Sequence, residues 1–470
     1  MTITPAQIDE WRAARSEHQN LEFKEAKDGL DSRKLCRYCV GLANEGGGHL
    51  LLGIEDKPPR KVVGTAAVND PVGMAAKLFS TLKFRVEVEE VQHPGGRVIV
   101  FQIPSRPLGT AYQYEGAYLM RSGEELVPMS EDRLRTIFAE GQPDWLSQSA
   151  MSAAADDDVI AMLDTQGYFD LLKLPYPTQR TGVLERLTGD GLIREDGNGW
   201  EISNLAAVLF AKKLDAFSPA LARKAVRVVI YDGINKLKTK DDKPGNRGYA
   251  IGFESLVDFV HSAAPQNRFI EQAVREEVKM FPKQALRELI ANALVHQDFL
   301  MTGTSVMIEM YDDRVEISNP GLPPIKVERF IDEYRSRNER LADLMRRMGI
   351  CEEKGSGIDK VITAAEFFQL PAPDFRAGEL RTTAILFAHQ EFPEMSRSDR
   401  IRACYQHCCL QYVSGKTMSN QSLRTRFGVD ENKVATVSTV IMAAKDAGLI
   451  KQDASESMST RYARYLPFWA

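Results

Sequence analysis

The segment from residue 17 to residue 56 limits the possible folds of this 470-residue chain more than any other. An alternating tetrapeptide, LEFK, is followed by an amphipathic stretch, a run of three glycines and the apolar run HLLLGIED. Alternation indicates a half-buried strand, and apolar residues at helical spacing indicate an amphipathic helix. The segment therefore predicts a strand–helix–strand unit whose second strand lies beside the first.

Charged side chains accompany both predicted strands. In LEFK the two apolar residues face one side, which leaves Glu22 and Lys24 on the free side. Glu17 precedes this strand and Asp56 ends the second. Carboxylates from separate elements can hold Mg²⁺ or Mn²⁺, which activates water, while Lys24 positions that water or offsets phosphate charge. An ordinary half-exposed strand shows the same alternation, so a surface role stays open.

Length and composition set broad limits. A chain of 470 residues predicts two to four domains. A net charge of −5 excludes a chain that is basic throughout, so nucleic acid would be contacted through local patches. No apolar run reaches the roughly 18 residues of a membrane span, so we expect no membrane partner. Scattered cysteines and a polar N-terminal segment predict a cytoplasmic protein.

The order of patterns predicts an α+β multidomain protein with four parts. Residues 1–142 alternate helices and apolar strands. Residues 143–213 contain a helix, a turn and a β-hairpin, which predicts a small winged-helix-like connector. Residues 214–392 combine helices with a largely antiparallel sheet, an α/β sandwich. Residues 393–470 predict a helix–turn–helix followed by a hairpin, a C-terminal winged helix.

The first part resembles the AlbA-type domain of the Schlafen family. The resemblance lies in the spacing of Glu17 and Glu22, the sequence EFK, the run ANEGGGHLLLGIED and the VVG at residues 62–64. Schlafen nucleases use three acids to cleave RNA, notably transfer RNA. The resemblance therefore implies that Glu17, Glu22 and Asp56 are catalytic metal ligands, and it implies a role in antiphage defence. Many bacterial relatives are called transcriptional regulators, which leaves a non-catalytic domain as the alternative.

A second set of residues predicts a nucleotide site. In RELIANALVHQD, Glu288 and Asn292 lie four residues apart on one helix face. An acid and an amide one turn apart can position a water molecule and bind magnesium. Asn319 and Gly321, in ISNPG, are predicted to lie where a strand enters a turn. Each pattern by itself is also compatible with surface pairing or an ordinary turn.

A glycine-containing segment precedes a later helix. CEEKGSGIDK places Lys354, Gly355 and Gly357 at the predicted helix start. Backbone N–H groups at such a start can bind an anion, and the helix dipole favours the negative charge. The segment therefore predicts phosphate contacts.

Together these motifs resemble the GHKL ATPase fold, in the divergent form found fused to Schlafen-type domains. The resemblance implies ATP as cofactor, with Glu288 as the base that activates water and Asn292 as a magnesium ligand. It also implies that Asn319 contacts adenine and that Gly355 and Gly357 contact phosphates. Asn319 replaces the aspartate of the commoner family form. The basic stretch RSRNERLADLMRRMG replaces the usual glycine-rich lid, and its side chains could contact phosphates.

The C-terminal part carries the predicted nucleic-acid contacts. The recognition helix is expected to start near residues 430–433. Side chains that could contact bases or phosphates are Arg424, Arg426, Lys433, Arg461 and Arg464. Acidic residues dilute this basic face, so a protein-contact role also stays open.

The combined patterns predict an ATP-regulated, metal-dependent endonuclease. Its expected substrate is RNA similar to transfer RNA, or single-stranded nucleic acid. We expect slow or regulatory use of ATP and a homo-oligomer. The alternative is an ATP-binding, DNA-binding transcriptional regulator whose Schlafen-like domain is not catalytic.

Overall fold

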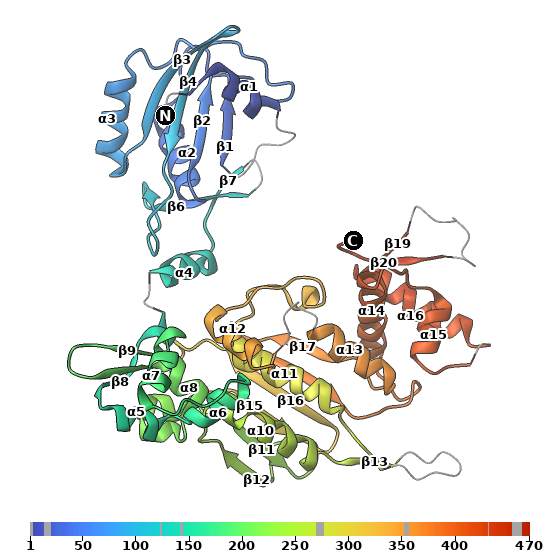
Figure 1. The fold of residues 1–470 in the computed structure, drawn as a ribbon. Coiled ribbons are helices and arrows are strands. Elements are labelled where there is room, and N and C mark those ends of the chain that lie inside the picture. The colour runs from blue at the N-terminus through green and yellow to red at the C-terminus, as the bar shows by residue number, and fades with distance from the viewer. Residues whose placement is uncertain are drawn as a thin grey trace. The chain divides into compact units, whose positions relative to one another are not determined.

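The computed structural model divides the chain into two compact units, residues 1–143 and 144–470 (Figure 1). The structure describes residues 3–13, 20–122, 125–141, 144–268, 277–351, 357–430, 432–453 and 463–470. No helix in these ranges is long and apolar enough to cross a membrane.

The first unit is built on a four-stranded mixed sheet of order β1-β2-β4-β3. Its strands are β1 (Leu21–Lys24), β2 (Gly48–Leu52), β3 (Glu87–His93) and β4 (Gly96–Ile103). β1 and β2 are parallel, and α2 (Ser32–Asn44) connects them. This confirms the predicted strand–helix–strand unit with adjacent strands.

Local sequence explains how the chain leaves α2 and enters β2. α2 begins after Asp31, whose Oδ1 accepts a hydrogen bond of 3.1 Å from the Arg33 N–H. At Gly47, which has a φ of +85°, a Cβ atom would lie 2.7 Å from the Ile103 carbonyl oxygen. The glycine run therefore allows the backbone to pass close to β4. The remaining elements are α1 (Pro5–Ala13), α3 (Pro71–Leu82), β5 (Gln113–Tyr114), β6 (Ala117–Ser122), β7 (Glu125–Pro128) and α4 (Glu131–Glu140).

The second unit begins with a small helical region that contains a three-stranded sheet of order β8-β10-β9. A helix, a turn and a hairpin follow one another as the sequence indicates. The very apolar helix after the hairpin, α8 (Asn204–Phe210), is buried along its whole length. The elements are η1 (Trp145–Ser147), β8 (Ser149–Ala154), α5 (Asp156–Met162), α6 (Thr165–Leu171), α7 (Arg180–Gly189), β9 (Ile193–Glu195), β10 (Trp200–Ser203) and α8 (Asn204–Phe210).

A six-stranded sheet of order β12-β11-β15-β16-β18-β17 forms the centre of the second unit. Apart from the parallel pair β11 and β15, neighbouring strands are antiparallel, as expected. Buried residues of α10 (Tyr249–Ala263) and α11 (Lys283–His296) share one core with this sheet. The strands are β11 (Arg227–Tyr231), β12 (Thr239–Pro244), β15 (Met307–Met310), β16 (Arg314–Pro320), β17 (Asp374–Ala377) and β18 (Arg381–Phe387).

Helices and short elements surround this sheet (Figure 1). The long helices are α10 (Tyr249–Ala263), α11 (Lys283–His296), α12 (Glu339–Arg347) and α13 (Gly357–Phe367). The shorter elements are η2 (Leu214–Ala216), α9 (Pro219–Ala222), β13 (Gln266–Arg268), β14 (Glu277–Lys279) and η3 (Val327–Arg329).

The C-terminal helices are not separate from the sheet region. The last elements are α14 (Arg397–Val413), α15 (Asn420–Arg426), α16 (Val434–Asp446), β19 (Ile450–Gln452) and β20 (Tyr465–Pro467). Their apolar core also contains Ile331, Ile362 and Ala372, which precede the predicted boundary at residue 392. This shared core fixes the C-terminal helices against the middle of the second unit.

Candidate functional site

The first candidate site lies where β1 and β2 end. Lys24 Nζ lies 2.8 Å from Glu22 Oε1 and 2.8 Å from Asp56 Oδ2. Asp56 Oδ1 also accepts a hydrogen bond of 3.2 Å from the Glu25 N–H. The fold therefore brings together three of the four predicted catalytic residues, because parallel β1 and β2 end at the same edge of the sheet. The fourth, Glu17, lies outside the described residues.

The expectation that Glu22 lies on a free face is wrong. Glu22 is 2 % exposed, and Arg121 Nη2 of β6 lies 2.7 Å from its Oε2. Arg121 also donates a hydrogen bond of 3.0 Å to the Leu21 carbonyl. Alternation within LEFK could not reveal that β6 covers this side of β1. A lone arginine in the apolar run AYLMRS is the signal that could have indicated it.

The charges in this cluster are tightly coupled. Burial by itself would lower the pKa of Lys24, but hydrogen bonds to Asp56 and Glu22 outweigh it and raise that pKa above its ordinary value. Burial raises the pKa of Tyr38, whose ring centroid lies 5.4 Å from Lys24 Nζ. The lysine therefore stays protonated and holds a positive charge between two carboxylates.

Glu22 and Asp56 are the two described carboxylates that could hold a metal ion in this cluster. Within the described parts of the chain, no group of three His, Cys, Asp or Glu side chains is arranged to hold a metal ion. Glu22 and Asp56 nevertheless approach one cation, Lys24 Nζ, from two sides. A divalent ion held by the same two carboxylates would have to displace the Lys24 ammonium from between them and would need a third ligand. Glu17 is the residue that the sequence predicts for that position.

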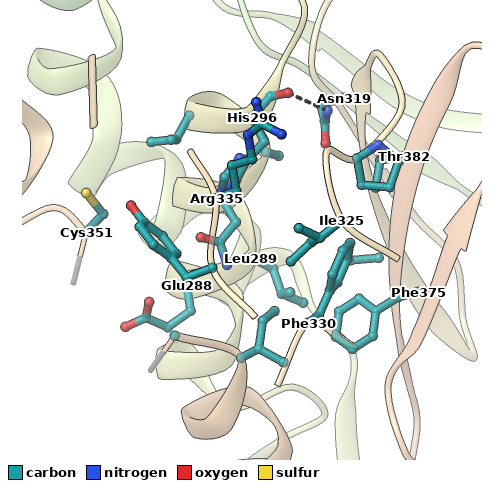
Figure 2. A pocket seen from close by; sticks show the side chains of 18 of the residues that line it. Glu288, Leu289, His296, Asn319, Ile325, Phe330, Arg335, Cys351, Phe375 and Thr382 are labelled. Carbon is teal, nitrogen blue, oxygen red and sulfur yellow. Dashed lines mark hydrogen bonds between the residues drawn. The ribbon is translucent and has the colours of Figure 1, made fainter. Parts of the chain in front are cut away.

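The second candidate site is a pocket in the second unit (Figure 2). Its walls come from α11, the end of β16, the segment after β16, α12, the start of α13, β17 and β18. Four predicted nucleotide-binding residues line it: Glu288, Asn292, Asn319 and Gly357. Lys354 and Gly355 lie outside the described residues. Glu288 and Asn292 lie together because of their spacing on α11, whereas the tertiary fold brings Asn319 and Gly357 to the same pocket.

Gly357 allows α13 to begin close to α11. A Cβ atom at this position would lie 2.9 Å from Glu288 Oε2 and 3.6 Å from Asn292 Nδ2. Lys360, one turn along α13, places its Nζ 3.9 Å from Glu288 Oε1. The start of α13 therefore faces an acid and an amide of α11, and Lys360 of α13 lies close to the same acid.

Gly321 serves the fold and is not among the described residues that line the pocket. Its φ is +96°, and a Cβ atom there would lie 2.8 Å from the Asp298 Cβ. Its N–H donates a hydrogen bond of 2.8 Å to the Leu380 carbonyl. The prediction that it contacts the nucleotide gains no support from this geometry.

Asn319 and His296 form the polar end of the pocket (Figure 2). Asn319 Nδ2 donates to the carbonyls of His296, at 3.4 Å, and Pro320, at 3.1 Å. The amide nitrogen is thus occupied, which leaves Oδ1 as the acceptor for a ligand. Burial, with a smaller contribution from the nearby Arg337 charge, lowers the pKa of His296 to about 4, so the imidazole is neutral at pH 7. Its Nδ1 is buried without a hydrogen-bond partner in the described structure.

The basic stretch that replaces the lid is mostly used for internal contacts. Arg337 forms an ion pair of 3.3 Å with Asp298. Asn338 donates hydrogen bonds of 2.7 and 2.8 Å to two backbone carbonyls at the end of α11. Arg340 donates to a serine hydroxyl in η1. Of these residues and Arg335, Arg335 is the one that lines the pocket.

Predicted nucleic-acid contacts in the C-terminal helices have different environments. Arg426 is 6 % exposed, donates a hydrogen bond of 2.7 Å to the Leu370 carbonyl and lies 3.4 Å from Glu366. Burial lowers the pKa of Arg426, and its predicted phosphate contact is wrong because the side chain is buried against Glu366 of α13 and the Leu370 carbonyl.

The other predicted contacts in this region are more accessible. Arg424 is half-buried and donates a hydrogen bond of 3.0 Å to the Asn420 Oδ1. Lys433 is exposed at the start of α16, and Arg464 is half-buried. Arg461 lies outside the described residues.

Comparison with known proteins identifies two domains. Residues 17–130 match the family model described as Schlafen, AlbA_2, which confirms the resemblance seen in the first part. Residues 303–386 match the model described as putative ATP-dependent DNA helicase RecG C-terminal. This second match includes Asn319 but begins after Glu288 and Asn292. No curated protein matches the chain.

Two solved structures are similar to this chain at low sequence identity. The crystal structure of the DIP2311 protein from Corynebacterium diphtheriae is 18 % identical, with a TM-score of 0.44, and the match covers 98 % of this chain and 96 % of that chain. The other is the solution structure of the N-terminal domain of a putative ATP-dependent DNA helicase RecG-related protein from Nitrosomonas europaea. It is 19 % identical, with a TM-score of 0.21, and the match covers 28 % of this chain and 92 % of that chain. From the two family matches, the chain contains a Schlafen AlbA_2 domain followed by a RecG-like C-terminal domain.

Proposed function

We propose that the second unit binds ATP with Mg²⁺ and that the chain acts on nucleic acid. The observation that carries the ATP proposal is the meeting of Glu288, Asn292, Asn319 and Gly357 around one pocket. These residues come from three elements that are separated in the sequence. Their joint position supports a common ligand better than four independent surface roles.

Each side of the pocket offers chemistry that suits part of a nucleotide. Asn319 Oδ1 can accept a hydrogen bond from the adenine amino group, since both N–H bonds of its amide point to carbonyls. The start of α13 at Gly357 presents N–H groups that favour phosphate. Oxygen atoms of Glu288 and Asn292 would hold Mg²⁺, which neutralises phosphate charge when bound.

Equilibrium binding of a fluorescent ATP analogue in the presence of Mg²⁺ tests this proposal. We expect saturable binding that ATP displaces better than GTP, because guanine offers an acceptor where adenine offers a donor. Asn319→Ala and Asn292→Ala should each weaken binding about tenfold, which corresponds to the loss of one well-placed polar contact. Asn198→Ala, in the exposed turn between β9 and β10, is the matched control. Equal affinities of all four proteins would contradict the assignment of this pocket.

For the first unit we propose nucleic-acid cleavage at Glu22, Lys24 and Asp56, with Glu17 as the third acid. The supporting observation is that Lys24 Nζ lies 2.8 Å from both described carboxylates. Glu22 and Asp56 would hold Mg²⁺ or Mn²⁺, and such an ion supplies an activated water. Lys24 can stabilise negative charge on the phosphate. RNA similar to transfer RNA, or single-stranded nucleic acid, is the proposed substrate, and antiphage defence the proposed setting.

A specific observation also favours the alternative function. Glu22 is buried, and Lys24 and Arg121 already balance its charge. A carboxylate in this state is a poorer ligand for an added cation than an open one. The alternative is therefore an ATP-binding, DNA-binding transcriptional regulator in which the first unit binds nucleic acid without cleaving it.

A cleavage assay separates the two functions. Wild-type protein, Glu22→Gln and Asp56→Asn are incubated with transfer RNA, single-stranded DNA or duplex DNA, with Mg²⁺ or Mn²⁺ and with or without ATP. The nuclease proposal expects cleavage by the wild type and at least a hundredfold loss in both variants, a typical order of magnitude for a lost catalytic group. Glu25→Gln, an exposed acid paired with Lys27, is the control. If the wild type and Asp56→Asn are equally inert on every substrate, the result favours the transcriptional regulator. The regulator function in turn predicts that the protein binds specific promoter DNA and that Lys433 is needed for this binding.

A further inference from the structure

One wall of the nucleotide pocket is a segment with little regular structure. It runs from residue 322 to residue 336, between β16 and α12, and η3 is its one described helical turn. Ile325, Phe330 and Arg335 point from it toward the cavity (Figure 2). Backbone hydrogen bonds within the wall join residues 326–333 around η3. Contacts from other elements therefore also contribute to the position of the wall.

Two aromatic residues of the C-terminal region contact the middle of this wall. Tyr405 of α14 donates a hydrogen bond of 2.6 Å from its hydroxyl to the Glu328 carbonyl. Trp469 donates a hydrogen bond of 3.2 Å from Nε1 to the same hydroxyl oxygen. The Arg329 guanidinium lies 4.8 Å from the Trp469 ring centroid, within the range of a cation–π contact. The wall is thus held at two consecutive residues.

Burial shows that these contacts belong to a packed interface. Tyr405 is 6 % exposed, and Ile331 of the wall is 8 % exposed within the core of the C-terminal helices. Phe330, next to Ile331, contacts Phe375 with ring centroids 5.5 Å apart and lines the pocket. Neighbouring residues of the wall therefore face the C-terminal core and the ligand cavity. A movement of Ile331 in the C-terminal core must therefore also move Phe330, the adjacent residue, in the pocket.

The opposite side of the pocket is anchored in the same helices. α13 begins at Gly357 in the pocket and carries Glu366 in its last turn. His407 Nδ1 of α14 lies 3.0 Å from Glu366 Oε1, and Arg426 Nε of α15 lies 3.4 Å from that oxygen. Ile362, also on α13, is buried in the C-terminal core. The wall is therefore supported by α14 and Trp469, and the phosphate-side helix is supported by α14 and α15.

We propose that Tyr405 and Trp469 are positioning residues for the nucleotide pocket and that the C-terminal helices and the nucleotide are thereby coupled. This inference rests on the proposed binding of ATP. Tyr405 and Trp469 hold the wall in the position that closes the cavity, and neither touches the ligand. Because coupling between two sites is reciprocal, a nucleotide that selects the closed wall stabilises the contacts of Tyr405 and Trp469 by the same factor. A nucleic acid or protein bound by the C-terminal helices would change nucleotide affinity through this route.

The test uses the full chain and a substitution that removes one hydroxyl group. Tyr405→Phe keeps the buried ring and deletes the hydrogen bonds to the Glu328 carbonyl and from Trp469. Tyr412→Phe is the matched control, since Tyr412 is on the same helix and contacts Trp469 through its ring. Affinity for the fluorescent ATP analogue, the thermal unfolding midpoint and amide hydrogen exchange of residues 325–335 are measured for wild type and both variants.

We expect Tyr405→Phe to weaken nucleotide binding about three- to tenfold, the order of magnitude that loss of one buried hydroxyl group and its hydrogen bonds predicts. Exchange of residues 325–335 should become faster in Tyr405→Phe without nucleotide, while Tyr412→Phe behaves as wild type. Saturating nucleotide should slow the exchange of residues 463–470 in the wild type, which a merely structural role of Tyr405 would not produce. Arg329→Ala should reproduce the faster exchange of the wall.

The outcomes separate this inference from the proposed function. If the wild type binds nucleotide and Tyr405→Phe binds it with the same affinity, the inference is overturned while ATP binding stands. If the wild type binds no adenine nucleotide, ATP binding fails, and hydrogen exchange of the wall decides whether Tyr405 positions it. Unchanged exchange of residues 325–335 in Tyr405→Phe overturns the inference in either case.

Discussion

Arg121 Nη2 lies 2.7 Å from Glu22 Oε2 inside the first unit, and each side chain is 2 % exposed. The pair joins β6 to β1, two strands that belong to different sheets. Burial of a carboxylate is costly unless an opposite charge compensates it. Arg121 therefore fixes the position of the acid at the centre of the proposed cleavage site and supplies an opposite charge beside it.

Replacing Arg121 should destabilise the first unit. Arg121→Ala leaves Glu22 buried with Lys24 as its remaining ion-pair partner in the described part of the chain, and we expect the free energy of unfolding to fall by about 3 kcal/mol. Urea denaturation followed by circular dichroism measures this change. Arg135→Ala is the control, because Arg135 and its partner Glu131 are 76 % and 88 % exposed, and it should change stability by less than about 0.5 kcal/mol. A similar small effect of both substitutions would show that the buried pair does not stabilise the unit.

The amide of Asn319 should be required in place of a carboxylate. In Asn319→Asp, a negative oxygen would face the carbonyls of His296 and Pro320, which now accept from Nδ2 at 3.4 and 3.1 Å. We expect a loss of about 1–3 kcal/mol in stability and weaker nucleotide binding, since a buried acceptor then faces acceptors. Thermal unfolding and nucleotide titration provide the measurements, and Asn198→Asp at an exposed turn serves as the control. Unchanged stability and affinity would mean that the amide nitrogen is not needed.

His296 should make stability depend on pH. Burial lowers its folded-state pKa to about 4 from an ordinary value of 6.5. Below pH 6.5 the unfolded chain binds a proton that the folded chain does not, so the stability contributed by the neutral imidazole is present above pH 6.5 and is lost as pH falls toward 4. The full loss amounts to about 3 kcal/mol.

A variant that cannot titrate isolates this effect. His296→Phe should show a smaller fall in unfolding free energy between pH 7.5 and pH 4.5 than the wild type, by about 2 kcal/mol. Denaturant unfolding at both pH values gives the difference for each protein. At pH 7.5 the imidazole is neutral in both folded and unfolded chains, so that measurement isolates the packing effect of the substitution. Parallel pH profiles for the two proteins would refute the assignment to His296.

Two cations of the C-terminal helices should respond differently to removal. Arg426 is buried beside Glu366, so Arg426→Ala should lower the free energy of unfolding by about 3 kcal/mol. Lys433 is exposed, so Lys433→Ala should leave the free energy of unfolding unchanged. If α16 binds nucleic acid, the substitution should reduce the slope of log affinity against log salt concentration by the amount expected for about one phosphate contact. Urea unfolding and binding titrations at several salt concentrations measure the two effects. If the salt dependence of nucleic-acid binding changes in Arg426→Ala and not in Lys433→Ala, then Arg426 and not Lys433 contacts a phosphate.

Much of the local structure could be predicted because its causes are local. Alternation in LEFK and the periodicity of the next stretch indicated β1 and α2, and the apolar run after the glycines indicated β2. The spacing of Glu288 and Asn292 on one helix predicted that they would share a face, which the pocket confirms. The two family resemblances also rested on such short motifs, and the matches to residues 17–130 and 303–386 agree with them.

What surrounds each side chain was decided by contacts between distant parts of the chain. The segment containing residues 17–56 determined by itself a strand, a helix, a second strand and acids at their ends. Only the tertiary structure buried Glu22 against Arg121, placed Lys24 between Glu22 and Asp56, and enclosed Arg426. The physical reason is that hydrophobic periodicity fixes which face of an element is apolar, whereas burial of a charge depends on which other element supplies its partner.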